Sequence, residues 1–198
     1  MSQKTIYFAH PMCDYGTARE AAVMSFLQEN DYTVINPADF QEEFQHWLRG
    51  VPLMPFNKQT VKLTPYNGDN YIQFWVELSQ LCDACAFCAF DDELNADSVP
   101  AGLEFIKDKT HPGLEWPVST NRIGAGVRAE VESFWTNNKP VVMLHVQALI
   151  DFDDIELEDP PIHYSIREQK LNQWDNNQIL LTVEQTKALL RASGRYDG

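Results

Sequence analysis

The chain has 198 residues, 44% of them hydrophobic and 12% aromatic, which is enough apolar material for one sizeable core and predicts a single domain over residues 1–198. Its 29 acidic and 15 basic residues give a formal net charge of −14. This excess argues against binding to a nucleic-acid polymer, whose phosphates need clustered Lys and Arg, and against binding to an anionic membrane surface. A small-molecule ligand is still allowed, because net charge bears on solubility and encounter more than on the chemistry of a site.

The amino-terminal residues lack the long apolar stretch and the small-residue cleavage site of a signal peptide. The apolar runs near residues 84–90 and 140–146 are much shorter than the roughly 20 residues that a membrane-spanning helix needs. We therefore expect a soluble, cytoplasmic protein.

The first third of the chain predicts a strand, a helix and a second strand. The β-rich run 4–9 ends at His10-Pro11, and residues 33–37 form a second run that ends at Pro37. Between them, Thr17 is placed to cap a helix that runs from Ala18 to about residue 30, and Glu20 completes a capping box with it.

Residues 38–70 form an irregular, aromatic-rich insert that is broken by several Pro and Gly residues. This length is long for a structureless loop, so we expect it to contain a short helix and to cover a site. An amphipathic helix over 71–81 and a buried strand over 84–90 follow.

Three of the four cysteines, Cys82, Cys85 and Cys88, have the C-x2-C-x2-C spacing of some iron–sulfur proteins. The run Ala84–Phe90 that contains two of them is apolar, and strand geometry places Cys85 and Cys88 on opposite faces. We therefore interpret these cysteines as core residues and expect neither a metal site nor a cofactor.

The second half begins with an irregular insert over residues 91–123, which carries an acidic cluster and several Pro and Gly residues. Gly124-Ala125-Gly126 then opens a helix to about residue 138, and a strand over 141–145 follows. Residues 151–161 read as an acidic, solvated connection. A short strand over 179–181 and a helix that ends near Ala192 complete the chain.

Strands that alternate with helices predict an α/β fold with a doubly wound, mainly parallel five-stranded sheet, flavodoxin-like or Rossmann-like, flanked by helices. Ligands of such sheets bind outside the carboxyl ends of the strands. The expected crevice therefore lies between His10-Pro11, the segment 90–92 and the turn 124–130.

The segment Gly126-Val127-Arg128-Ala129-Glu130, with Lys139-Pro140-Val141 downstream, resembles the G-x-x-x-E…K-P-V pattern of the nucleoside 2-deoxyribosyltransferase family. The opening strand 4–9, with Tyr7, and the step Cys82-Asp83-Ala84 before a hydrophobic strand are similar to the same family. The likeness covers roughly residues 4–37 and 71–146.

This resemblance implies that Glu130 is a nucleophile that attacks the anomeric carbon of a (deoxy)nucleoside and expels the base, with transfer to a second base or hydrolysis by water. It implies that Tyr7 orients Glu130, and that the enzyme forms a homo-oligomer. The family carries an aspartate on the helix before the third strand, where this chain has Trp75. Asp92 and Glu77 are the candidates for the acid partner.

The turn after the first strand departs from the family and suggests a phosphate-binding alternative. Gly16 and Thr17 at a helix N-terminus, beside His10, are a candidate 5′-phosphate site, and Arg128 is a candidate cation. Asp91, Gly124 and Gly126 are the other candidate substrate-binding residues.

Three functions are therefore open: a nucleoside 2-deoxyribosyltransferase-like enzyme, a 5′-nucleotide N-glycoside hydrolase, and a non-catalytic nucleotide-binding or sensing module. The acidic balance favours a nucleoside over a nucleotide. Glu132 is the comparison residue, because we expect it on a different helix face from Glu130.

Overall fold

The computed structural model describes residues 4–90, 121–150 and 162–192. Side chains are described up to residue 147 in the second range and up to residue 191 in the third. Asp91, Asp92, most of the second insert and the acidic connection 151–161 lie outside the described residues. No helix among the described residues has the length and apolar character to cross a membrane.

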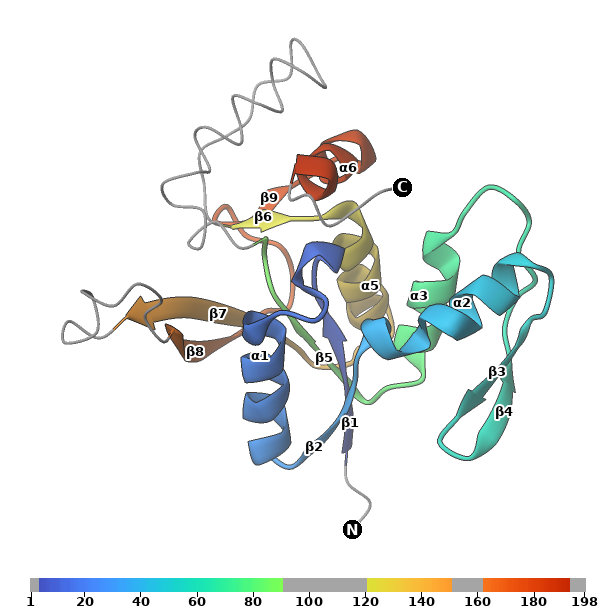
Figure 1. Cartoon of the computed structure of the whole chain (residues 1–198), viewed down its shortest axis with the longest axis horizontal. Helices are drawn as coiled ribbons and strands as arrows, with labels where there is room; N and C mark the ends of the chain where they lie inside the picture. Colours follow the sequence, from blue (N-terminus) through green and yellow to red (C-terminus); the bar gives the residue numbers. More distant parts are fainter. Residues whose placement is uncertain (1–3, 91–120, 151–161, 193–198) are drawn as a thin grey trace.

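A five-stranded sheet, in the order β2-β1-β5-β7-β8, forms the centre of the fold (Figure 1). Strands β1 (Lys4–Ala9), β2 (Tyr32–Ile35), β5 (Ala84–Phe87) and β7 (Val141–Ile150) pair in parallel, and β8 (Ile162–Lys170) pairs antiparallel with β7. The predicted mainly parallel five-stranded sheet is therefore confirmed. Its fifth strand, however, is β8 and not the strand predicted over 179–181.

Alternating side chains of β1 supply two separate cores. Tyr7 and Ala9 pack with the inner faces of α3 (Ile72–Gln80) and α5 (Ala125–Thr136), whereas Ile6 and Phe8 pack with α1 (Ala18–Glu29). Because side chains alternate along a strand, this pattern places helices on both faces of the sheet.

The cysteines follow the same alternation. Cys85 belongs to the core beneath α3 and α5, and Cys88 belongs to the core beneath α1, as the strand geometry predicts. All four cysteines are free thiols, and burial raises the pKa of Cys82 to about 12. No group of His, Cys, Asp and Glu suited to a metal ion occurs among the described residues.

The N-terminus of α1 is capped as predicted on one side only. The Glu20 N–H donates to Thr17 Oγ1 at 3.1 Å. In a capping box the Glu20 carboxylate would accept the Thr17 N–H, but it accepts the Gly16 N–H at 2.6 Å instead, and the Thr17 N–H donates to the Asp14 carbonyl oxygen. Only one of the two predicted capping-box hydrogen bonds therefore forms. The other is absent because the Glu20 carboxylate bonds to Gly16, His10 and Asn36 instead.

The insert 38–70 is more regular than predicted. After a 3₁₀ turn η2 (Pro37–Phe40), it forms α2 (Gln41–Leu48) and a hairpin of β3 (Leu53–Phe56) and β4 (Gln59–Lys62). Asn57 and Lys58 connect the two strands, and both have positive φ, as in the type I′ turns that suit hairpins. Asn-Lys is a weaker turn signal than Asn-Gly, which is why the sequence did not indicate this hairpin.

The carboxyl-terminal third holds the largest corrections. The strand predicted over 179–181 forms as β9 (Ile179–Leu180), but it pairs with β6 (Arg122–Ile123) in a separate two-stranded sheet. The end of the insert predicted over 91–123 is therefore a strand, and the fifth strand of the main sheet is the unpredicted β8. The helix α6 (Val183–Ala192) follows β9 as predicted.

Lys139 joins α5 and β7 to the corner between α3 and β5. Its Nζ donates to the carbonyl oxygens of Gln80 at 2.6 Å and Cys82 at 2.7 Å, at the C-terminal end of α3. A cation at this end of a helix satisfies carbonyl groups that lack intrahelical partners.

We expect the Lys139→Met substitution to lower the free energy of unfolding by about 1 to 2 kcal/mol, because two charge-assisted hydrogen bonds are lost. Urea denaturation followed by circular dichroism measures this change. Lys62→Met, at an exposed position on β4, is the matched control and should change the free energy of unfolding little. Equal losses in both variants would contradict this structural role of Lys139.

Candidate active site

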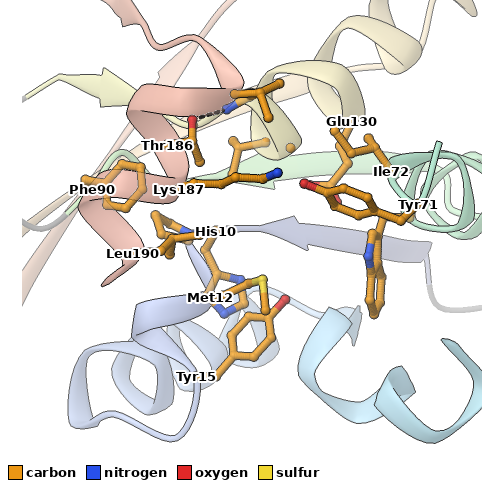
Figure 2. A pocket seen from close by; sticks show the side chains of 17 residues that line it. His10, Met12, Tyr15, Tyr71, Ile72, Phe90, Glu130, Thr186, Lys187 and Leu190 are labelled. Atoms are coloured by element: carbon orange, nitrogen blue, oxygen red, sulfur yellow. Dashed lines mark hydrogen bonds between the residues drawn. The ribbon is translucent and has the colours of Figure 1, made fainter. Parts of the chain in front are cut away.

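A pocket opens beyond the carboxyl ends of β1 and β5, as the fold predicts (Figure 2). It has about 750 Å³ of empty space, part of it open to solvent at the mouth. Residues from five segments line it, namely His10, Pro11, Met12, Tyr15, Tyr71, Ile72, Trp75, Phe90, Gly124, Ala125, Gly126, Val127, Glu130, Val183, Thr186, Lys187 and Leu190.

Glu130 lies at the inner wall of this pocket and is 7% exposed. The hydroxyl of Tyr7, a fully buried residue on the central strand β1, donates to Glu130 Oε1 at 2.9 Å. These two residues are 123 positions apart in the sequence. The structure thus brings together the residues that were expected to act as a pair.

Burial raises the pKa of Glu130 to about 8, and the hydrogen bond from Tyr7 opposes part of this rise. Burial and the neighbouring Glu130 raise the pKa of Tyr7 well above its ordinary value. Tyr7 is therefore a neutral donor, and Glu130 is a carboxyl group that changes charge close to neutral pH. Such displaced carboxyl groups in pockets are typical of catalytic sites.

Glu132, the comparison residue, lies on the face of α5 opposite to Glu130. Glu132 Oε1 accepts hydrogen bonds from Arg128 Nε at 2.8 Å and from Trp174 Nε1 at 2.9 Å, and the Arg128 and Glu132 side chains are about half exposed. The expected separation of Glu130 and Glu132 is confirmed. Arg128 does not line the pocket, because its position on α5 directs it to Glu132.

The N-terminus of α5 forms part of the pocket wall. The Ala125 N–H donates to Thr186 Oγ1 at 2.9 Å, and no acceptor for the N–H groups of Gly126 and Val127 exists in the part of the chain that the structure describes. A Cβ added at Gly124 would lie 3.2 Å from both the Phe90 ring and Thr186, whereas one at Gly126 would meet open space. Gly124 thus allows close packing of α6, and Gly126 leaves the first turn of α5 open to a ligand.

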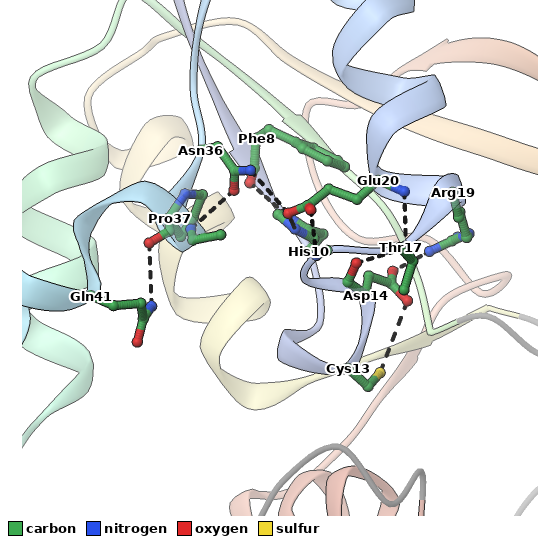
Figure 3. Close-up of polar contacts among 12 residues, drawn as sticks. Phe8, His10, Cys13, Asp14, Thr17, Arg19, Glu20, Asn36, Pro37 and Gln41 are labelled. Carbon is green, nitrogen blue, oxygen red and sulfur yellow. Dashed lines mark hydrogen bonds and ion pairs between the residues drawn. The ribbon is translucent and has the colours of Figure 1, made fainter.

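The turn after β1 does not form the expected phosphate site. Gly16 and Thr17 do not line the pocket, and the Gly16 N–H is already bound by the Glu20 carboxylate. His10 lines the pocket, but both ring nitrogens contact protein oxygens: Nδ1 lies 2.9 Å from the Phe8 carbonyl oxygen and Nε2 lies 2.9 Å from Glu20 Oε1 (Figure 3). A carboxylate at this helix N-terminus takes the place that an anionic ligand would need.

Glu77 does not reach the pocket and is not available as the acid partner there. Its Oε2 accepts the Thr64 N–H at 2.8 Å and its Oε1 accepts from Gln73 Nε2 at 2.9 Å. Glu77 therefore fixes the chain between β4 and α3. Trp75, on the same helix, lines the pocket instead.

Sequence reasoning missed the contribution of α6. Val183, Thr186, Lys187 and Leu190 line the pocket, and Figure 2 shows the Lys187 side chain extended into it. No short motif marks these residues. They reach the pocket through the pairing of β6 with β9, which are separated by more than 50 residues of sequence.

Comparisons with protein-family models, with curated proteins and with solved structures found no match to this chain.

Proposed function

We propose that this protein is a nucleoside 2-deoxyribosyltransferase-like enzyme that cleaves or transfers the N-glycosidic bond of a (deoxy)nucleoside. The observation that carries the proposal is the Tyr7–Glu130 hydrogen bond at the inner wall of a pocket beyond the strand ends. The sheet order is that of a flavodoxin-like, doubly wound fold if its strands are numbered in chain order as 2-1-3-4-5, with the last strand antiparallel. We include this fold assignment, the cytoplasmic location and a homo-oligomeric assembly in the proposal.

In the proposed reaction, the ionised Glu130 carboxylate attacks the anomeric carbon. A C–O bond forms, the C–N bond breaks, and the base leaves with the bonding electron pair and takes up a proton. A second base or water then attacks the same carbon and releases Glu130. Asp92, which lies outside the described residues, is our proposed proton donor on the sequence alone, because it lies just past the strand predicted over 84–90.

The lining of the pocket suits a nucleoside. The aromatic side chains of Tyr71 and Trp75 form part of it. Flat aromatic surfaces of this kind stack on a nucleobase, and Glu130 provides a polar contact.

The direct test is incubation of the wild-type chain with a panel of ribo- and deoxynucleosides, each with and without a free acceptor base. Chromatography then measures base release and base exchange. We expect release or exchange with at least one substrate. Binding without turnover across the panel, by wild-type protein that is folded, would exclude the enzyme and favour the sensing module.

A second candidate, a 5′-nucleotide N-glycoside hydrolase, is favoured by the positive character of one wall. Lys187 lines the pocket, and the open N–H groups of Gly126 and Val127 belong to the positive end of α5. Below its pKa of about 8, Glu130 adds no negative charge to this region. The local charge thus differs from the −14 of the whole chain.

If a 5′-phosphate binds at this wall, Lys187→Met should raise the KM for a nucleoside 5′-monophosphate by about tenfold or more and leave the KM for the nucleoside almost unchanged. Steady-state kinetics with both substrates measures the ratio. Arg191→Met is the matched control, because Arg191 is an exposed cation on α6 that does not line the pocket. Equal effects of Lys187→Met on both substrates would exclude a phosphate contact.

A further inference from the structure

His10 lies beneath the pocket in a buried hydrogen-bond network that connects three elements. Its side chain is completely buried, and that of Glu20 is 9% exposed. Glu20 Oε1 also accepts from Asn36 Nδ2 at 2.9 Å, so the network joins the end of β1, the first turn of α1 and the end of β2 (Figure 3).

The contacts of His10 require two ring protons if Glu20 is ionised. The Phe8 carbonyl oxygen is only an acceptor, so His10 Nδ1 must carry a proton to bond to it at 2.9 Å. A carboxylate oxygen is also only an acceptor, so Nε2 must carry a proton to bond to Glu20 Oε1.

Three donors indicate that Glu20 is ionised. Its carboxylate receives the His10 ring, the Asn36 amide and the Gly16 N–H. The Asn36 amide is oriented unambiguously, because its Oδ1 accepts the Ala38 N–H at 3.0 Å and leaves Nδ2 to face Glu20. Burial would raise the pKa of Glu20, but these hydrogen bonds outweigh burial and hold the pKa below its ordinary value.

The segment between His10 and Glu20 supplies one wall of the pocket through Met12 and Tyr15. The His10 ring stacks on Phe8 with centroids 4.0 Å apart and contacts the Tyr15 ring at 5.0 Å. No hydrogen-bond partner of the Tyr15 hydroxyl exists among the described residues, and Tyr15 lines the pocket.

Three other ionisable side chains near the network affect the charge that His10 can carry. Burial, followed by the nearby Glu130 and Glu20, raises the pKa of Tyr15, which is therefore a neutral phenol. Lys187 lines the same pocket from α6 and opposes a positive charge on His10. Burial, followed by the charge of the nearby Glu20, raises the pKa of Asp39.

We propose that His10 is a positioning residue that carries protons on both ring nitrogens, and that its ion pair with Glu20 holds Tyr15 in place in the pocket that Glu130 also lines. Loss of one ring proton removes either the bond to Phe8 or the bond to Glu20. The wall that carries Tyr15 then loses its attachment to β1 or α1. The consequence for turnover rests on the proposed function, whereas the ion pair does not.

The first test is the protonation of the ring itself in the wild-type chain labelled with ¹⁵N-histidine. Two-bond ¹H–¹⁵N correlation spectra at pH 7.5 should show two protonated nitrogens for His10. The signals that are absent from the spectrum of a His10→Gln variant assign the His10 ring. A bare nitrogen on His10 at pH 7.5 would overturn the proposal.

The second test compares Glu20→Gln with Glu29→Gln, a substitution at an exposed position on the same helix. In Glu20→Gln alone, His10 should lose one ring proton at pH 7.5 and the ¹³C signal of the Tyr15 ring, assigned with Tyr15→Phe, should move. The kcat for base release should fall by about tenfold or more in Glu20→Gln, because small displacements of groups at a reacting centre have large effects on rate. Unchanged Tyr15 and His10 signals would overturn the positioning role.

The proposed function and the positioning role of His10 can be disproved independently of each other. If the wild type releases no base from any substrate, the proposed function is wrong, but the His10 and Tyr15 signals still decide the positioning role. If Glu20→Gln does not fold, a pH titration of the wild type decides it, because the Tyr15 signal should change at the pH at which His10 loses its ring proton. Separate transitions would overturn the coupling.

Discussion

Glu130→Gln should reduce base release or exchange by about 10⁴-fold or more, because an amide cannot form the glycosyl ester that the proposed reaction requires. Glutamine has nearly the same shape and keeps an oxygen for the Tyr7 hydroxyl, which lies 2.9 Å from Glu130 Oε1. Substrate binding should therefore persist, so the loss should appear in kcat more than in KM. Steady-state kinetics and isothermal titration with the same substrate measure the two effects.

Glu132→Gln is the matched control for this experiment. Glu132 lies on the same helix, two positions away, but bonds to Arg128 and Trp174 outside the pocket. Its substitution should leave kcat within about twofold of the wild type and change stability only slightly. If Glu130→Gln retains wild-type turnover, Glu130 is not the nucleophile.

Stability and activity should respond to pH in opposite directions through Glu130. Its pKa rises from an ordinary 4.5 to about 8 in the folded chain. Between these values the folded state binds a proton that the unfolded state does not bind, so the stability from this group is complete below pH 4.5 and is lost as the pH rises to about 8. The whole difference is on the order of 5 kcal/mol.

Urea denaturation of the wild type and of Glu130→Gln between pH 5 and 9 measures this contribution. The wild type should become less stable relative to Glu130→Gln as the pH rises. In the same interval kcat/KM of the wild type should increase up to about pH 8, because the carboxylate is the proposed nucleophile. A constant stability difference and a flat rate profile would show that Glu130 is ionised throughout.

Tyr7→Phe separates the hydrogen bond from burial. The bond from Tyr7 lowers the pKa of Glu130, so its removal should raise that pKa further and move the rise in kcat/KM to higher pH. A movement to lower pH would contradict the assignment of Tyr7 as the donor.

The sequence alone predicted the elements whose signals are local. The boundaries of β1 agree with the prediction, Thr17 caps α1, and the alternation of the strand places Cys85 and Cys88 in different cores. The strand β8 was missed because an edge strand has one exposed side and carries many polar residues, so it lacks an apolar run.

The residues of the candidate site were predicted only in part. The strand-end rule brought together His10, Phe90 and the turn 124–130, each of which contributes to one pocket, and the family resemblance paired Tyr7 with Glu130. Arg128, Gly16, Thr17 and Glu77 were assigned to the site and lie outside its lining. Arg128 bonds instead to Glu132, Gly16 and Thr17 bond to Glu20 in the first turn of α1, and Glu77 bonds to Thr64 and Gln73.

The sequence by itself determined which face of each strand and helix is apolar, because side-chain direction follows from the local backbone period. Only the tertiary structure decided the charge and protonation of the pocket. Burial, which depends on every packed neighbour, places the pKa of Glu130 near neutrality, and the pairing of β6 with β9 accompanies the placement of Lys187 at the pocket wall. A net charge of −14 is a sum over the chain, whereas the field at a site depends on the few groups within reach of the ligand.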